Sequence, residues 1–226
     1  MVADHQGGGR QGGVSNQSHA LKPGGADALL FDLGGVVIDI DFNRAFACWA
    51  GHAKCDERLV RERFSPDAAY NRHEIGEIGV EDYFVSLRAS LGIALTHAQF
   101  LDGWNAIFIG AVPGIAELLA RAAQHLPLYA FTNTNPTHAA YWSEKFPDAV
   151  KSFKKVFVSS SIGLRKPDAE AFAFVVRDIG VPAKRIVFFD DSPHNIEGAG
   201  ACGLQTVLVK SPSDVVAALA ALGLIG

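Results

Sequence analysis

The sequence predicts an α/β fold: a parallel β-sheet covered by helices on both faces, with a small all-helical domain inserted after the first strand. Three observations point to this fold. Short apolar runs recur along the 226 residues, amphipathic helical patterns separate them, and one long stretch holds helical patterns only. The length suits one core domain with a modest insertion.

Five apolar runs are typical of strands that are buried on both faces. Each is short, rich in β-branched or aromatic side chains, and lacks the alternation of a half-exposed strand. In chain order they occupy residues 28–31, 128–131, 156–158, 186–189 and 206–209.

Helical patterns lie between these runs. Pro113 and Pro167 are each expected to open an amphipathic helix, and Gly180 to end the second one, because proline favours the first turn and glycine the position after the last. Ser211 and Asp214 resemble a capping box before the final helix. Strands that alternate with helices favour a parallel sheet.

The stretch from about residue 43 to residue 110 contains helical segments and no convincing strand. One helix is expected to start at Thr96, with Gln99 completing a capping box. Large aromatic residues supply its apolar faces: Trp49, Phe64, Tyr70, Phe84, Phe100 and Trp104. We expect residues 43–110 to form a helical cap domain, and residues 26–42 and 111–226 to form the α/β core.

The composition argues against nucleic acid and membranes as partners of this chain. With 20 basic and 24 acidic residues and no cluster of Lys and Arg, the chain is not expected to bind nucleic acid. No apolar stretch is long enough for a bilayer, so no membrane partner is expected. Residues 1–25 are rich in Gly, Gln, Ser and His and are predicted to be a flexible leader without a signal peptide.

The three cysteines, Cys48, Cys55 and Cys202, have spacings that fit no zinc motif. Free cysteine is usually buried and reduced, which favours a cytoplasmic protein. The oligomeric state stays open at this point.

Polar residues follow the predicted strands at their carboxyl ends, where parallel sheets bind ligands. Asp32 follows the first strand, Thr132 ends the second, Lys166 comes after the third, and Asp190 and Asp191 follow the fourth. We therefore expect one carboxylate, one hydroxyl, one lysine and one acidic pair to meet at a single edge.

This set of side chains suits phosphoryl transfer. A carboxylate can form an aspartyl-phosphate. Carboxylates placed side by side need a cation, and Mg²⁺ prefers oxygen ligands. A hydroxyl, backbone N–H groups and a lysine can hold phosphate oxygens and stabilise developing charge.

Four segments resemble, in the right order, the four motifs of the haloacid dehalogenase-like superfamily. FDLGGVVID is similar to the first motif, FTN to the second, the Lys166-Pro167 pair to the third and FFDDSPHNIEGA to the fourth, covering about residues 28–210. The segments DIDFN and FTNTN are similar to bacterial sugar-phosphate phosphatases, notably those acting on α-D-glucose 1-phosphate. The resemblance implies a Rossmann-like core with an inserted cap, and Mg²⁺-dependent hydrolysis of a small phosphorylated metabolite, such as a hexose 1-phosphate, through an aspartyl-phosphate.

The resemblance also implies a role for each matching position. Asp32 would be the nucleophile, and Lys166 would neutralise Asp32 and the phosphate. The phosphate-binding residues would be Thr132, Asn133 (through its backbone), Gly34 and Gly35. The metal ligands would be Asp32, the Gly34 carbonyl and Asp191, with Asp190 and Asn195 in support. For Asp190, orienting Lys166 is the alternative to binding metal.

Gly34 departs from most phosphatases of the superfamily, which have an aspartate general acid there. Such an acid typically contributes ~10²–10⁴ in rate. The sugar phosphatases that this chain resembles also have glycine, so activity is still expected. His73 and Glu74 of the cap are candidate replacements, with an exposed helix face as the alternative.

Several alternatives remain. A haloacid dehalogenase would share the nucleophile but need no metal, a sugar-phosphate mutase would share the cap, and a phosphate-sensing protein would have lost activity with the acid. Arg165 is expected to be solvated, and His138 and His194 to be exposed loop histidines. Trp49 and Trp104 are expected to pack the cap rather than contact a sugar.

Overall fold

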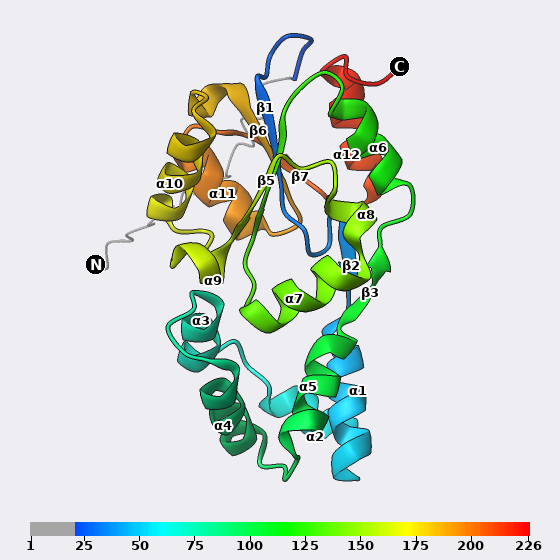
Figure 1. Ribbon diagram of the computed structural model, residues 1–226, viewed down its shortest axis with the longest axis vertical. Helices are drawn as coiled ribbons and strands as arrows, with labels where there is room; N and C mark the ends of the chain where they lie inside the picture. Colours follow the sequence, from blue (N-terminus) through cyan, green and yellow to red (C-terminus); the bar gives the residue numbers. More distant parts are fainter. Residues whose placement is uncertain (1–20) are drawn as a thin grey trace, which may run out of the picture.

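The computed structural model describes residues 21–226, and its centre is a five-stranded parallel sheet (Figure 1). The strands follow the order β5-β4-β1-β6-β7. Their bounds are Ala28–Phe31 (β1), Leu128–Thr132 (β4), Lys155–Val158 (β5), Ile186–Asp190 (β6) and Gln205–Leu208 (β7). The predicted α/β fold and its five parallel strands are confirmed, with boundaries that differ by at most one residue.

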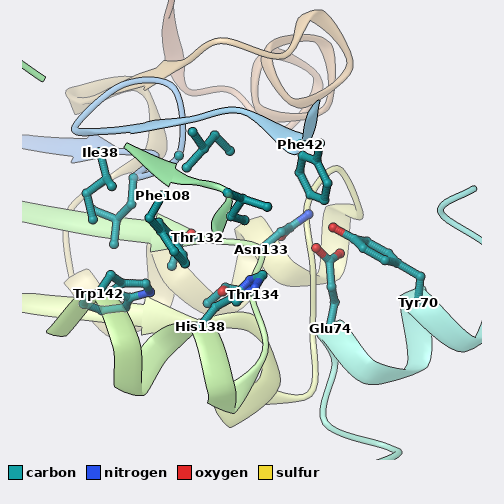
Figure 2. A pocket seen from close by; sticks show the side chains of 14 residues that line it. Ile38, Phe42, Tyr70, Glu74, Phe108, Thr132, Asn133, Thr134, His138 and Trp142 are labelled. Atoms are coloured by element: carbon teal, nitrogen blue, oxygen red, sulfur yellow. The ribbon is translucent and has the colours of Figure 1, made fainter. Parts of the chain in front are cut away.

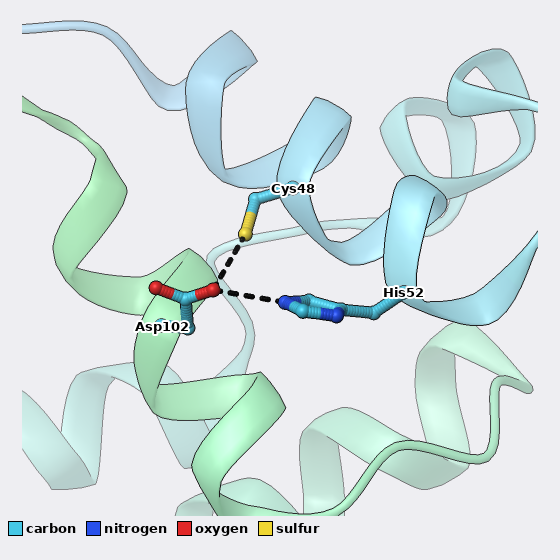
Figure 3. Close-up of side chains that lie close together, drawn as sticks. All are labelled: Cys48, His52 and Asp102. Atoms are coloured by element: carbon cyan, nitrogen blue, oxygen red, sulfur yellow. Dashed lines mark hydrogen bonds and ion pairs between the residues drawn. The ribbon is translucent and has the colours of Figure 1, made fainter.

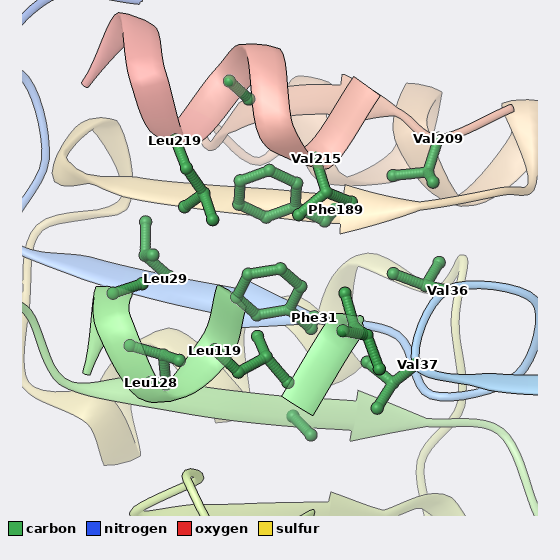
Figure 4. Packing of buried hydrophobic residues seen from close by; sticks show 14 of the residues in the cluster. Leu29, Phe31, Val36, Val37, Leu119, Leu128, Phe189, Val209, Val215 and Leu219 are labelled. Carbon is green, nitrogen blue, oxygen red and sulfur yellow. The ribbon is translucent and has the colours of Figure 1, made fainter. Parts of the chain in front are cut away.

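Both faces of the sheet are buried, which explains the apolar runs. Leu29 and Phe31 of β1 pack on one side, and Ala28 and Leu30 pack on the other. Figure 4 shows the first side, where Phe31 stacks on Phe189 with ring centroids 4.3 Å apart. A strand with this environment has no solvent face and therefore no polar alternation.

Four helices provide most of the cover. The first side is covered by α6 (Ile115–Ala122) and α12 (Pro212–Ala221), and the second by α10 (Ala169–Ile179) and α11 (Pro193–Ala201). On the first side lie also α7 (Pro136–Lys145) and α8 (Pro147–Val150), and α9 (Ser159–Ile162) follows β5 directly.

The predicted helix ends are partly wrong. α6 begins at Ile115 because Gly114 has a left-handed φ of 76°, and α10 begins at Ala169, so Pro113 and Pro167 lie in the preceding turns and do not open the helices. Gly180 does end α10, again with a left-handed backbone. The capping box of Ser211 with Asp214 is present at the start of α12.

Five helices follow the first strand and pack around a separate apolar cluster, and we call them the cap. They are α1 (Phe42–Ala53), α2 (Glu57–Arg63), α3 (Ala68–Glu74), α4 (Val80–Leu91) and α5 (His97–Ala106). Trp49 and Trp104 are fully buried in this cluster, as their expected packing role requires. The capping box of Thr96 with Gln99 is present. In Figure 1 the cap lies beyond one end of the sheet, below α7 and α9.

A two-stranded antiparallel ribbon connects core and cap. It pairs β2 (Ile38–Ile40) with β3 (Phe108–Ala111). The prediction that residues 43–110 contain no strand is therefore wrong for the last residues of that range, since β3 begins at Phe108. β3 has only four residues, which are too few to predict a strand from their sequence alone. They form a strand because they pair with β2. The chain enters and leaves the cap side by side.

Five residues of the predicted leader, 21–25, belong to the described residues and lie against the core. The flexible leader predicted for residues 1–25 falls mostly on residues 1–20, which lie outside the described residues. Residues 21–25, however, contact the core: Arg185 Nη1 donates to the Gly24 carbonyl at 2.8 Å, and Gln205 Nε2 donates to the Gly25 carbonyl at 2.9 Å.

The structure also tests the predicted burial of the cysteines and the length of the helices. Cys48, Cys55 and Cys202 are free but partly exposed, not buried as predicted. Within residues 21–226, no helix has both the length and the apolar character needed to cross a membrane.

Candidate active site

The site lies where the direction of the strand order reverses. β1 is central, β4 pairs with one of its edges and β6 with the other, so the loops after these three strands meet at one carboxyl edge. This brings together Asp32, Thr132 and Asp190, and Lys166 joins them from the loop between α9 and α10.

Lys166 contacts two carboxylates of the site. Its Nζ lies 3.0 Å from Asp32 Oδ1 and 2.7 Å from Asp190 Oδ2, and its side chain is 0% exposed. The rings of Phe131 and Phe188 flank the ammonium, each with its centroid 5.4 Å away. Burial alone would lower the pKa of Lys166, but the two carboxylates outweigh it and raise this pKa. The lysine therefore stays charged without contact with water.

Asn133 holds the backbone of Lys166. Its Nδ2 donates to the Lys166 carbonyl at 2.8 Å, and its Oδ1 accepts the Lys166 N–H at 2.9 Å. The sequence predicted a phosphate contact for the Asn133 backbone and missed this side-chain role. The two residues are 33 positions apart, so no local pattern could reveal the pair.

Asp190 is fully buried and organises the loop after β6. It accepts hydrogen bonds from Lys166 Nζ, from Asn195 Nδ2 at 3.0 and 3.1 Å, and from the Ser192 N–H at 2.8 Å. Its contacts match the alternative in which Asp190 orients Lys166, and Asn195 supports Asp190 directly.

An oxygen-only cluster forms beside this lysine. Carboxylate oxygens of Asp32, Asp190 and Asp191 lie within 4.8 Å of one another. Burial raises the pKa of Asp32 to about 7, with the neighbouring carboxylates adding to the effect and Lys166 opposing it. Burial and Asp190 also raise the pKa of Asp191. Three carboxylates around one lysine leave surplus negative charge, which fits a hard divalent cation such as Mg²⁺.

The loop after β1 approaches this cluster closely. Gly35 has a left-handed φ of 73°, and a Cβ there would lie 2.4 Å from Asp191 Oδ2, so the position requires glycine. The Leu33 N–H donates to Asp32 Oδ1 at 2.7 Å. The Gly35 N–H donates to the Ile38 carbonyl at 2.9 Å. A phosphate contact from the Gly35 amide would require that bond to break.

A pocket with a cavity volume of about 80 Å³, partly open to solvent, lies between core and cap (Figure 2). Gly34, Thr132 and Asn133 line its core side, and Tyr70 and Glu74 of α3 line its cap side. Apolar side chains make up much of the rest: Leu33, Ile38, Ile40, Phe42, Ile107, Phe108 and Trp142. Three of the four predicted phosphate-binding residues thus line a mainly apolar pocket, and Gly35 does not.

Glu74 is buried, contrary to the exposed helix face considered for it. Arg165 contacts Glu74 Oε2 through Nη2 at 2.8 Å and Nε at 3.0 Å, so Arg165 is not simply solvated either. Burial raises the pKa of Glu74, although Arg165 and Tyr70 act against it. Ser159 adds a second link between core and cap, because its Oγ lies 2.6 Å from the Glu74 carbonyl. The end of α3 is therefore held against the core.

Two histidines that were considered exposed are buried in the structure. His73 is buried and stacks on Tyr83 with ring centroids 4.8 Å apart. His138 is buried too, with Nε2 2.8 Å from the Trp104 carbonyl and Nδ1 3.2 Å from Asn135 Nδ2. Nδ1 faces an amide donor, so Nε2 carries the proton and donates to the carbonyl. His194 is exposed as expected, although it lies in the first turn of α11 and not in a loop.

Acid should destabilise the protein through His138. Burial lowers its pKa from 6.5 to about 3, so the unfolded chain takes up the proton first as the pH falls. The free energy of unfolding should drop below pH 6.5, by up to about 1.4 kcal/mol per pH unit from this group. Urea denaturation between pH 7 and pH 5 measures the slope. His138→Gln should have a smaller slope, and an equal slope in both proteins would contradict the assignment.

Comparison with known proteins gives the relatives of this chain. The model of the haloacid dehalogenase-like hydrolase family matches residues 26–203, more than half of the chain. A D-ribitol-5-phosphate phosphatase of Bacteroides thetaiotaomicron is 25% identical, over 82% of this chain and 93% of that protein. A sesquiterpene phosphatase of Aspergillus oryzae is 24% identical, over 78% of this chain and 86% of that protein.

Solved structures agree with this match. A haloacid dehalogenase family enzyme of Bacteroides thetaiotaomicron, in complex with magnesium and inorganic phosphate, aligns with a TM-score of 0.72 and 26% identity, over 82% of this chain and 95% of that chain. An L-2-haloacid dehalogenase of Xanthobacter autotrophicus shares the fold, with a TM-score of 0.60 and 18% identity, over 80% of this chain and 76% of that chain.

Proposed function

The chain belongs to the haloacid dehalogenase-like hydrolases and is a phosphatase of that family, and we propose that it cleaves a small phosphate monoester with Asp32 as nucleophile and Mg²⁺ as cofactor. One observation carries the proposal. The charged Lys166 bridges Asp32 and Asp190 inside a cluster of carboxylates at the carboxyl edge of the sheet. A pure phosphate-binding protein would have no use for a carboxylate in the nucleophile position.

In the proposed reaction, Asp32 attacks phosphorus and forms an aspartyl-phosphate as the alcohol leaves. Water then cleaves the intermediate and releases phosphate. Lys166 neutralises the negative charge on Asp32 and the phosphoryl oxygens, while the Thr132 hydroxyl and backbone groups of Asn133 and Gly34 hold those oxygens. Asp32, Asp191 and the Gly34 carbonyl would hold Mg²⁺, which supplies further charge neutralisation.

We propose a sugar or sugar-alcohol phosphate as the substrate, with a hexose 1-phosphate first among the candidates. Tyr70 and Glu74 offer polar groups to substrate hydroxyls on the cap side of the pocket. The relative that acts on D-ribitol 5-phosphate supports the same class. An anomeric leaving group needs little proton assistance, which is consistent with a glycine, and no general acid, at position 34.

The apolar pocket walls favour a second candidate, an isoprenoid monophosphate. Phe42, Phe108 and Trp142 could pack against a hydrocarbon chain, and a sesquiterpene phosphatase is among the relatives. The two substrate classes share the same chemistry at Asp32 and differ only in what fills the pocket.

Removing the metal should stop phosphate release. The test measures release from glucose 1-phosphate, ribitol 5-phosphate and farnesyl monophosphate, with Mg²⁺ and with EDTA. We expect metal-dependent release, because the surplus charge of the three carboxylates opposes an incoming phosphate. Phosphate release that persists in EDTA would contradict the metal requirement, and halide release from 2-chloropropionate without metal would favour the dehalogenase alternative. No release from any phosphate by the folded protein would favour a binding role.

We propose that Glu74 acts on the leaving group in place of the acid missing at Gly34. Its carboxyl lines the pocket, and burial raises its pKa, which is the direction that a general acid needs. Glu74→Gln should slow hydrolysis of a sugar-alcohol phosphate by about 10²-fold, the typical effect of a general acid. Hydrolysis of p-nitrophenyl phosphate, whose leaving group needs no proton, should change little.

Two variants control this test. Glu77→Gln removes an exposed carboxylate of the same cap region, paired with Arg72, and should leave both rates unchanged. Gly34→Asp should restore part of the rate lost in Glu74→Gln, because a Cβ at Gly34 meets only the Ile40 side chain, at 3.1 Å. An equal loss on both substrates would assign Glu74 a purely structural role with Arg165.

A further inference from the structure

A second cluster of side chains that could ligate a metal lies on the cap, between α1 and α5 (Figure 3). It consists of Cys48, His52 and Asp102. Asp102 Oδ2 lies 3.5 Å from Cys48 Sγ and 2.9 Å from His52 Nε2. One ligand atom from each residue lies within 4.8 Å of the other two.

Two features of the cap bring these side chains together. Cys48 and His52 are four positions apart on α1, so they share one helix face. Asp102 comes from α5, which crosses α1 very closely: a Cβ at Gly103 would lie 2.2 Å from Trp49 Nε1. Trp49 Nε1 also donates to the Phe100 carbonyl at 3.0 Å, which fixes how the two helices meet. The buried crossing therefore preorganises the exposed cluster.

We propose that Cys48, His52 and Asp102 form a Zn²⁺ site, separate from the active site and independent of the proposed function. Thiolate, imidazole and carboxylate are the ligands that zinc takes, and three protein ligands leave the fourth tetrahedral position to water. The sulfur and nitrogen donors distinguish this site from the oxygen-only cluster at Asp32, which suits Mg²⁺. The ion can enter from solvent, since the side chains of His52 and Asp102 are 34% and 65% exposed.

The expectation that the cysteine spacings fit no zinc motif did not cover this site. That expectation compared neighbouring cysteines, whereas the third ligand here is an aspartate 54 positions after Cys48. A bound ion would tie the first helix of the cap to the last. Because the ion would bind the folded cap and not the unfolded chain, it should stabilise the fold.

Co²⁺ is a suitable probe, because thiolate coordination gives it a near-ultraviolet charge-transfer absorption that oxygen ligands do not give. The full chain is titrated with Co²⁺ in excess Mg²⁺, which occupies the carboxylate cluster. We expect the absorption in the unmodified protein and in Cys202→Ser, and its loss in Cys48→Ser. His52→Ala should weaken binding by more than the ~10–100-fold that loss of an outer-shell partner costs.

Thermal unfolding gives an independent readout. Zn²⁺ should raise the Tm of the unmodified protein and of Cys202→Ser, but not that of Cys48→Ser. Phosphate release should be equal in Cys48→Ser and the unmodified protein, which separates this site from the active site. Absence of the thiolate absorption in the unmodified protein, or its persistence in Cys48→Ser, would overturn the proposal.

Discussion

Asparagine in place of Asp32 should reduce phosphate release by about 10⁴-fold or more, the scale of loss for a covalent nucleophile. The amide keeps the size of the carboxylate but cannot attack phosphorus. The measurement is steady-state release at saturating Mg²⁺, with trapping of the aspartyl-phosphate as a second readout.

The same substitution should leave the fold intact and its stability equal or higher. Asp32 is largely buried beside Asp190 and Asp191, with its side chain 13% exposed, and this environment disfavours its charge. Asp39→Asn is a matched control, because Asp39 is an exposed carboxylate on β2. Retained turnover in Asp32→Asn would remove Asp32 as the nucleophile.

Methionine in place of Lys166 should reduce both activity and stability. Loss of the ammonium removes charge stabilisation from the phosphoryl group, at a cost of about 10²–10³ in kcat by analogy with loss of an oxyanion donor. It also leaves Asp190 buried without its partner, which should lower the free energy of unfolding by about 3–5 kcal/mol. Urea denaturation and phosphate release measure the two effects.

Two further variants test the cause of the lost stability. Lys155→Met removes a lysine that is 47% exposed and paired with Asp178, and should change stability by no more than about 1 kcal/mol. Adding Asp190→Asn to Lys166→Met should restore part of the lost stability, because the uncompensated charge is then gone. No recovery in the double variant would show that Lys166 stabilises the core by packing alone.

Much of the fold could be predicted from the sequence because the sheet is buried on both faces. That environment requires short apolar runs, and the runs located all five strands of the sheet. Capping boxes at Thr96 and Ser211 located two helix starts, since each motif acts within four residues. β3 could not be found in this way, because its four residues are a strand only in the presence of β2.

The candidate site was also predicted only in part from the sequence. The positions of Asp32, Thr132 and Asp190 at strand ends follow from the chain itself, since parallel strands share one carboxyl edge. The types of these side chains indicated phosphoryl transfer, but the role of each residue relied on the family resemblance.

What the sequence by itself determined is therefore local: strands, helix caps and the residues that follow each strand. The tertiary structure alone decided the contacts between distant segments. It buried Glu74 against Arg165, held Lys166 through the Asn133 side chain, and placed Asp102 beside Cys48. Each of these pairs joins residues more than 30 positions apart, and their contacts depend on how helices and loops pack, which no local periodicity records.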